Sequence, residues 1–250
     1  MKKKCSSVYA SVILTLVTLL TFPLTCLAQE VKKNLDMVTL GQIPYGFSTA
    51  EGEFKGAFYE VLNEIMVVSK IGNANNILPF KRVLARIRAD KKFCTIAAND
   101  DDNTPLFDLV EPIGFKMVTG VLPAPTIELN DYSNLKGISI AVPLGAFISD
   151  KFNNDNALIK VSSSKYDNAI KMLKSDRVDA VAGSIPALMY ITKKQGIDKN
   201  YFGKPLLLQS FDVYLLCSYG LSPEVRSSLK KTLIELKSKG KVQQILNDYF

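Results

Sequence analysis

Short apolar runs alternate with amphipathic helical segments along this 250-residue chain, and this alternation limits the fold more than any other feature. The run at 93–98, for example, has the composition of a buried strand. A chain that alternates strands and helices in this way folds into an α/β structure. The predicted strands are 37–40, 77–78, 93–98, 107–122, 138–142, 158–161, 178–182, 206–208 and 213–217.

Helices are indicated where apolar residues recur at intervals of three and four, as they do at 58–66 and again at 80–87. Near the end of the chain, Ser222 has the chemistry of an N-cap and Pro223 follows it in the first helical position. Gly240 is placed to end that helix. A last short helix is predicted over 242–250.

The strand–helix pattern restarts near residue 124, which predicts two lobes joined by two crossings. In the second lobe, residues 144–146 form a turn that is expected to lead directly into a helix. Ser164 and Asp167 have the spacing of a capping box and predict another helix start. A further helix is expected over 185–194.

The first residues have the three-part layout of a secretory signal. Lys2, Lys3 and Lys4 precede an apolar run at 8–22, and a cut after Ala28 would follow small residues. We therefore expect export to the periplasm. Two alternatives remain: a membrane anchor, for which the apolar run is short, or a lipoprotein cut before Cys26, for which the preceding residues match poorly.

Composition excludes several kinds of chemistry. The chain has no histidine, so Ser-His-Asp and Cys-His nucleophiles and histidine-based zinc sites are ruled out. We expect no metal and no cofactor. The net charge of +7 includes the basic leader, and the net charge of the other residues is too small to indicate nucleic-acid binding. Outside the leader, Cys94 and Cys217 can be either a disulfide or two buried thiols.

Several motifs occur in an order typical of one protein family. Residues 42–47 read QIPYGF, and residues 52–61 read GEFKGAFYEV. Residues 135–145 read LKGISIAVPLG, and residues 173–181 read LKSDRVDAV. Together with 79–95 and the C-terminal helices, these segments resemble the extracellular solute-binding proteins of family 3, the amino-acid-type binding components of ABC transporters. The resemblance covers nearly the whole chain beyond the leader.

The resemblance implies a periplasmic-binding-protein type II fold, with two α/β lobes, hinge crossings near 117–123 and 203–212, and a ligand cleft between the lobes. It divides the chain into a leader (1–28), a first lobe (29–120), a second lobe (121–205) and a C-terminal return to the first lobe (206–250). Ligands of open α/β sheets bind beyond the carboxyl ends of the strands. The ligand-binding residues expected there are Tyr45, Phe47, Phe80, Arg82, Asn99, Asp100, Gly145, Ala146, Phe147 and Ser184.

Specific roles follow for some of these residues. Tyr45 and Phe47 are expected either to form an apolar wall of the cleft or simply to pack within their lobe. Gly145 would let backbone N–H groups approach an anion at a helix start, or would only form a tight turn. Arg82 would grip a carboxylate through its planar guanidinium, unless it is an ordinary solvated side chain.

Two departures from the family pattern bear on the ligand. The family's carboxylate-clamping arginine is missing from 103–107, and Ser184 stands where the family has an ammonium-binding aspartate. Since a buried charge needs a partner, these losses argue against an ordinary amino acid held in the usual way.

Three functions follow as hypotheses. The first is a monomeric binding protein that holds a small polar solute for an inner-membrane ABC permease or a sensor. The second is an enzyme on the same fold, for which Asp100 and Glu111 would be the candidate acids. The third is a module that binds no ligand and serves only protein contacts.

Overall fold

A computed structural model describes residues 35–79, 82–83, 85–86, 89, 92–99 and 107–250. The predicted secretory signal lies outside these residues. None of the helices within the described ranges is long and apolar enough to cross a membrane.

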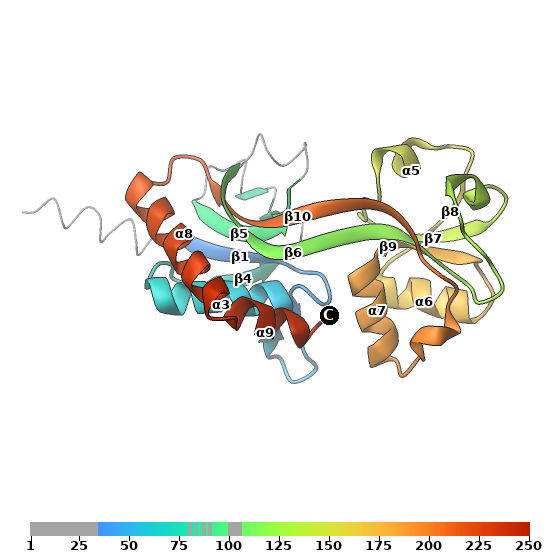
Figure 1. The fold of residues 1–250 in the computed structure, drawn as a ribbon, viewed down its shortest axis with the longest axis horizontal. Coiled ribbons are helices and arrows are strands. Elements are labelled where there is room, and N and C mark those ends of the chain that lie inside the picture. Colours follow the sequence, from blue (N-terminus) through green and yellow to red (C-terminus); the bar gives the residue numbers. More distant parts are fainter. Residues whose placement is uncertain (1–34, 80–81, 84, 87–88, 90–91, 100–106) are drawn as a thin grey trace, which may run out of the picture.

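One mixed sheet of eight strands runs through the molecule in the order β4-β1-β5-β10-β6-β9-β7-β8 (Figure 1). Its strands are β1 (Asp36–Leu40), β4 (Asn75–Leu78), β5 (Phe93–Ala98), β6 (Phe107–Pro123), β7 (Ser139–Pro143), β8 (Ile159–Ser163), β9 (Ala180–Ser184) and β10 (Leu206–Ser218). β1 lies parallel to β4 and β5, and β7 lies parallel to β8 and β9. These two parallel groups form the sheets of the first and second lobes.

The two groups are joined by β6 and β10, which pair with each other antiparallel along most of their length. β10 also pairs with β5 on one side, and β6 pairs with β9 on the other. Figure 1 shows the two long strands side by side across the middle of the molecule. The sequence predicted two separate strands at 206–208 and 213–217, which is wrong. The segment between them, 209–212, stays hydrogen-bonded to β6. The pairing register shifts at each end of this segment, at Leu207/Gln209 and at Asp212/Tyr214.

Helices cover each half of the sheet. In the first lobe these are α3 (Ala57–Ser69), α8 (Pro223–Ser238) and α9 (Lys241–Asn247), which bury Val61, Leu229 and Ile245 in one core. In the second lobe, α6 (Tyr166–Lys174) and α7 (Ile185–Lys194) bury Ile170 and Leu188 in another. A small hairpin of β2 (Phe47–Ser48) and β3 (Phe54–Lys55) precedes α3. The shorter helices are η2 (Tyr132–Leu135), α5 (Asp150–Asn154) and η3 (Lys199–Tyr201).

The predicted capping box at the start of α6 is wrong. The N-cap is Lys165, whose side chain does not cap the helix. Ser164 lies outside the helix, and its hydroxyl accepts a hydrogen bond from the Asn168 amide at 2.6 Å. The start of α8 agrees with the prediction, because Ser222 accepts a hydrogen bond from the Val225 backbone N–H.

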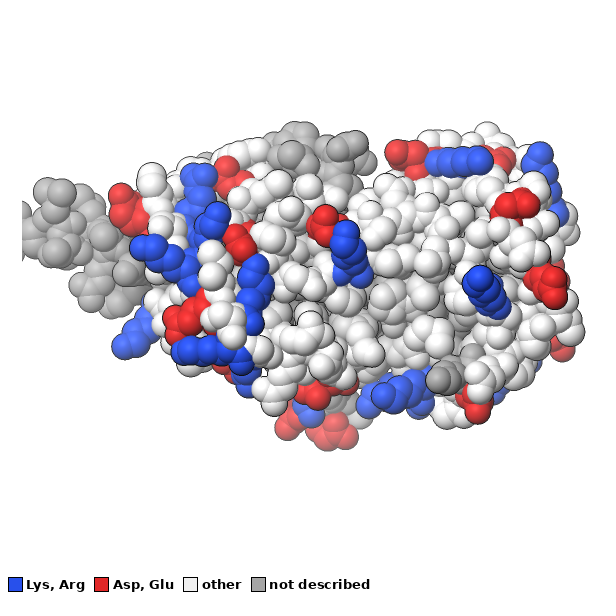
Figure 2. Space-filling view, viewed as in Figure 1, with Lys and Arg blue, Asp and Glu red and all other residues white. Residues whose placement is uncertain are grey.

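Charged side chains lie over both halves of the face shown in Figure 2 and along its lower edge, and a broad part of the band between the lobes is uncharged. Glu111 of β6 forms ion pairs with two lysines of α8, with Lys237 at 2.6 Å and with Lys230 at 3.6 Å. The Glu111 side chain is only 14% exposed, so these contacts fasten α8 to β6.

Cys94 and Cys217 form a disulfide, which resolves the two alternatives that the sequence left open. They are register partners on the neighbouring strands β5 and β10, and both are fully buried. The bond links residues 123 positions apart in the sequence. It therefore ties the early part of the first lobe to the strand that returns from the second.

Replacing both cysteines by alanine is expected to lower the free energy of unfolding by about 2–5 kcal/mol, because the unfolded chain loses a long covalent loop. Urea unfolding of the wild type and of Cys94→Ala/Cys217→Ala measures the difference. Reduced wild type serves as the control and should resemble the double variant. Equal midpoints for all three proteins, with two titratable thiols in the untreated wild type, would contradict the disulfide.

Candidate functional site

Tyr45 links the two lobes at the centre of the molecule. It follows β1, is 3% exposed, and its ring stacks on Phe58 of α3 with the centroids 4.6 Å apart. Its hydroxyl lies 2.6 Å from the Ser184 hydroxyl at the end of β9. Burial raises the pKa of Tyr45 well above its usual value, so the phenol stays neutral and available for this hydrogen bond.

Ser184 has its polar groups occupied by the protein itself. Its hydroxyl caps α7 by accepting from the Ala187 backbone N–H at 3.5 Å, and its own N–H donates to the Tyr166 hydroxyl at 3.1 Å. A side chain at Gly183 would lie 2.3 Å from the Tyr166 ring, so glycine is required there. At the position where the resemblance implies an ammonium-binding acid, two tyrosine hydroxyls therefore surround a buried serine.

The loop after β7 is more open. Gly145 and Phe147 are exposed, and the Phe147 ring lies 6.1 Å from Phe211 of β10. Ala146 is half-buried. Gly145 adopts a positive φ of 80° in a turn, but the helix that follows begins only at Asp150 and has five residues. The expectation that Gly145 lies at a helix start is therefore wrong, because residues 144–149 form an intervening loop.

The remaining predicted residues are not brought together by the described structure. Phe80 and Asp100 lie outside the described residues. Arg82 is exposed and forms no ion pair with any described residue. Asn99 is half-buried at the end of β5, where its backbone N–H donates to the Asp212 carbonyl at 2.9 Å.

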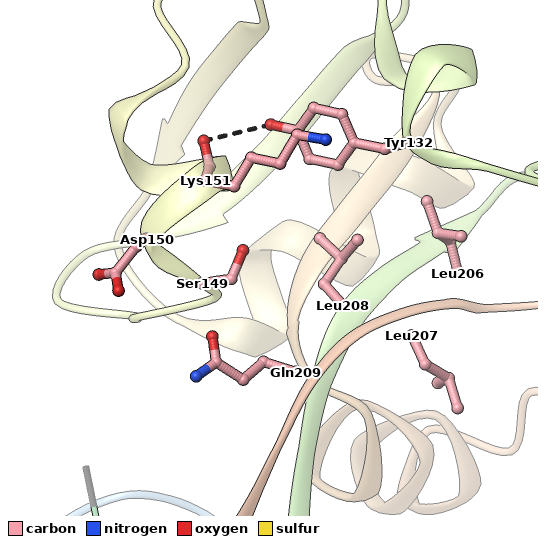
Figure 3. A pocket seen from close by; sticks show the side chains of 8 residues that line it. All are labelled: Tyr132, Ser149, Asp150, Lys151, Leu206, Leu207, Leu208 and Gln209. Atoms are coloured by element: carbon pink, nitrogen blue, oxygen red, sulfur yellow. Dashed lines mark hydrogen bonds between the residues drawn. The ribbon is translucent and has the colours of Figure 1, made fainter. Parts of the chain in front are cut away.

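A cavity of about 430 Å³ lies beside β10 within the second lobe (Figure 3). Ser149, Gln209 and Leu208 line it, and Figure 3 shows the Tyr132 hydroxyl donating to the Lys151 carbonyl. The Lys151 ammonium lies 3.9 Å from the centroid of the Tyr132 ring. Burial, followed by the Asp155 carboxylate, raises the pKa of Tyr132 to about 12. Since these groups come from one lobe and the crossing strand, a ligand here would not bridge the two lobes.

A larger cavity of about 610 Å³ is lined from both lobes. This volume is in the range of small-molecule sites. The first lobe contributes Phe47, Glu60 and Tyr249, and the second contributes Asp167 and Tyr190. The full lining is Ile43, Phe47, Ser48, Thr49, Lys55, Glu60, Asp167, Tyr190, Ile191, Lys194, Asp248 and Tyr249.

Of the predicted ligand-binding residues that the structure describes, only Phe47 lines this larger cavity. Glu60, Tyr190 and Tyr249 were missed because each lies on or beside a helix at a position that amphipathic spacing assigns to an ordinary surface. Their convergence depends on how the second lobe folds back towards α3 and α9, and no local pattern encodes that arrangement.

No family model matches the sequence, and no curated protein matches it. Solved structures do resemble it. ArgBP from T. maritima, as a P235GK mutant, superposes with a TM-score of 0.68 at 16% identity, over 87% of this chain and 95% of that one. The glutamate-bound GluR0 ligand-binding core from Nostoc punctiforme gives 0.68 at 18% identity, over 86% and 98%.

A third structure, a histidine kinase sensor domain with similarity to periplasmic binding proteins, superposes with a TM-score of 0.69 at 13% identity, over 88% of this chain and 97% of that one. The chain has the two-lobed fold of periplasmic binding proteins. The α/β architecture expected from the sequence is thereby confirmed, and nearly the full length of each of these three structures is matched.

Replacing Tyr45 by phenylalanine is expected to lower the free energy of unfolding by about 1–2 kcal/mol, because it removes one member of a buried hydrogen-bonded pair. Urea unfolding measures the change. Tyr59→Phe is the matched control, since the Tyr59 hydroxyl has no hydrogen-bond partner within the described chain; its effect should stay within about 0.5 kcal/mol. Equal losses in the two variants would mean that the Tyr45–Ser184 contact adds no stability.

Proposed function

We propose that the protein is a periplasmic solute-binding protein that captures a small polar solute between its two lobes. The single observation that carries this proposal is that a cavity of small-molecule size has walls from both lobes, and that these lobes are joined through the two long strands β6 and β10. A ligand in such a cavity contacts both lobes at once. It therefore favours the closed arrangement of the lobes over the open one.

The proposal keeps the lobe boundaries at 29–120, 121–205 and 206–250, with the leader 1–28 removed on export. We also propose that the protein is a monomer, and that an inner-membrane ABC permease or a sensor recognises its closed form. Support for these partners comes from the neighbours: one resembling structure is a substrate-binding domain of a putative amino acid ABC transporter from Streptococcus pneumoniae, and another is a kinase sensor domain.

The enzyme hypothesis has less support. Of its two candidate acids, Asp100 lies outside the described residues. Glu111 faces α8, where it is paired with Lys230 and Lys237, and so serves the packing of the first lobe. The resembling structures include a binding protein, a ligand-binding core and a sensor domain.

One observation favours a second candidate, the module that binds no ligand. Tyr45 and Ser184 join the lobes directly through their hydroxyls, and Ala187 of α7 packs in the core of the first lobe. A closed form held by such contacts could present itself to a membrane partner without any solute.

Screening the mature protein by thermal shift against amines, amino acids, organic acids and short peptides distinguishes the two candidates. A solute at 100 times its Kd is expected to stabilise a binding protein by about 2.7 kcal/mol. Small-angle X-ray scattering should show a smaller radius of gyration when that solute is present. Stabilisation by a purified membrane partner, with none by any solute, would favour the ligand-free module, and turnover of the solute would contradict a pure binding protein.

A further inference from the structure

The Glu60 carboxylate lines the inter-lobe cavity of about 610 Å³ and forms no ion pair with any residue that the structure describes. Glu60 lies on α3 and is half-buried. One of its oxygens accepts a hydrogen bond from the Tyr249 hydroxyl, which in turn accepts from the Gly56 backbone N–H at 3.0 Å. Throughout the described part of the chain, no lysine or arginine lies within ion-pair distance of Glu60, and its second oxygen has no donor.

Such a carboxylate differs from its neighbour one turn along the same helix. Glu64 is paired with Lys241 of α9 at 3.4 Å. An ionised carboxylate that is partly removed from water is stabilised by an opposite charge and by hydrogen bonds to its free lone pairs. Glu60 lacks the opposite charge and has an open cavity beside it, so a cation entering that cavity would supply what the protein does not.

Aromatic rings flank this carboxylate from both lobes. Tyr190 of α7 and Tyr249 stack with their centroids 5.9 Å apart, and Phe47 lies 6.5 Å from Tyr190. The Tyr190 ring already has a cation close by, since the Lys194 ammonium lies 5.6 Å from its centroid. Cations bind over the faces of such rings within about 6 Å. The pKa of Tyr190 is raised by burial and by the nearby Glu60 charge, against a smaller opposing effect of the Lys55 ammonium, so the phenol stays neutral.

The other charges of the cavity are compatible with a cationic guest. Three carboxylates line it, from Glu60, Asp167 and Asp248, against two ammonium groups. One of these, from Lys55, is exposed and lies 3.1 Å from the Glu53 carboxylate, which partly offsets its charge. The other, from Lys194, belongs to an exposed side chain on the rim of the second lobe.

We propose that the inter-lobe cavity binds an organic cation, a compound with an ammonium or guanidinium group on an apolar body, whose charge pairs with Glu60 beside the stacked rings of Tyr190 and Tyr249. This inference rests on the proposed solute-binding function and names the class of solute. Ile43 and Ile191 would contact the apolar body. Because Glu60 and Tyr249 belong to the first lobe and Tyr190 to the second, the same cation contacts both lobes.

Isothermal titration calorimetry with phenethylamine and with agmatine tests this directly, and 3-phenylpropionate is the anionic counterpart of the first probe. Both cations should bind, and the anion should not. Glu60→Gln keeps the size of the side chain and removes its charge, and is expected to weaken binding of the cations at least tenfold, equivalent to about 1.4 kcal/mol. Glu64→Gln is the matched control on the same helix and should leave the Kd within about twofold.

A second variant covers the case in which Glu60→Gln fails to fold. Tyr190→Leu keeps an apolar side chain on α7 and removes the aromatic face, and should weaken cation binding about two- to fivefold. Circular dichroism establishes that each variant is folded.

The outcomes separate this inference from the function on which it rests. If the cations fail to bind while another solute stabilises and compacts the protein, the cation site is wrong and the solute-binding function holds. Cation binding that is unchanged in both Glu60→Gln and Tyr190→Leu would also overturn the site. If no solute of any class binds, the proposed function itself fails.

Discussion

The antiparallel pairing of β6 with β10 is the interaction on which the rest of the structure depends. Each strand contributes one edge to a lobe, because β10 pairs with β5 and β6 pairs with β9. The two parallel groups of strands therefore belong to one continuous hydrogen-bonded sheet and are not connected by loops alone. Register shifts at Leu207/Gln209 and Asp212/Tyr214 place irregular backbone between the lobes. If the lobes change their angle on binding a solute, as the proposed function requires, this irregular backbone is where the crossing strands would bend.

Much of this architecture could be predicted from the sequence, because local periodicity reports which segments are buried. β5 and α7 begin and end at the predicted residues. Prediction was wrong where two local signals competed. Ser164 and Asp167 have capping-box spacing, yet Ser164 binds Asn168 and α6 starts at Tyr166. The polar residues within 209–212 interrupt an apolar pattern, yet backbone pairing with β6 keeps the strand intact.

The site was less predictable than the fold, for a physical reason. A loop at the end of a strand can be located from sequence, and the structure has Tyr45 after β1 and Ser184 at the end of β9, as predicted. The sequence does not tell whether two such side chains face a solute or each other. Here they face each other. Glu60 and Tyr249 meet only because α3 and the C-terminal helices pack together. Contacts of this kind depend on tertiary packing, which residue spacing does not report.

The disulfide has a consequence for the order in which the chain is assembled. Between Cys94 and Cys217 lie β7, β8 and β9, which form the whole parallel sheet of the second lobe. In a chain that emerges from a membrane channel N-terminus first, the second lobe is therefore complete before Cys217 appears. The first lobe, although it starts earlier, must wait for β10 and can be covalently closed only afterwards. The lobe that is begun first is thus the one that is finished last.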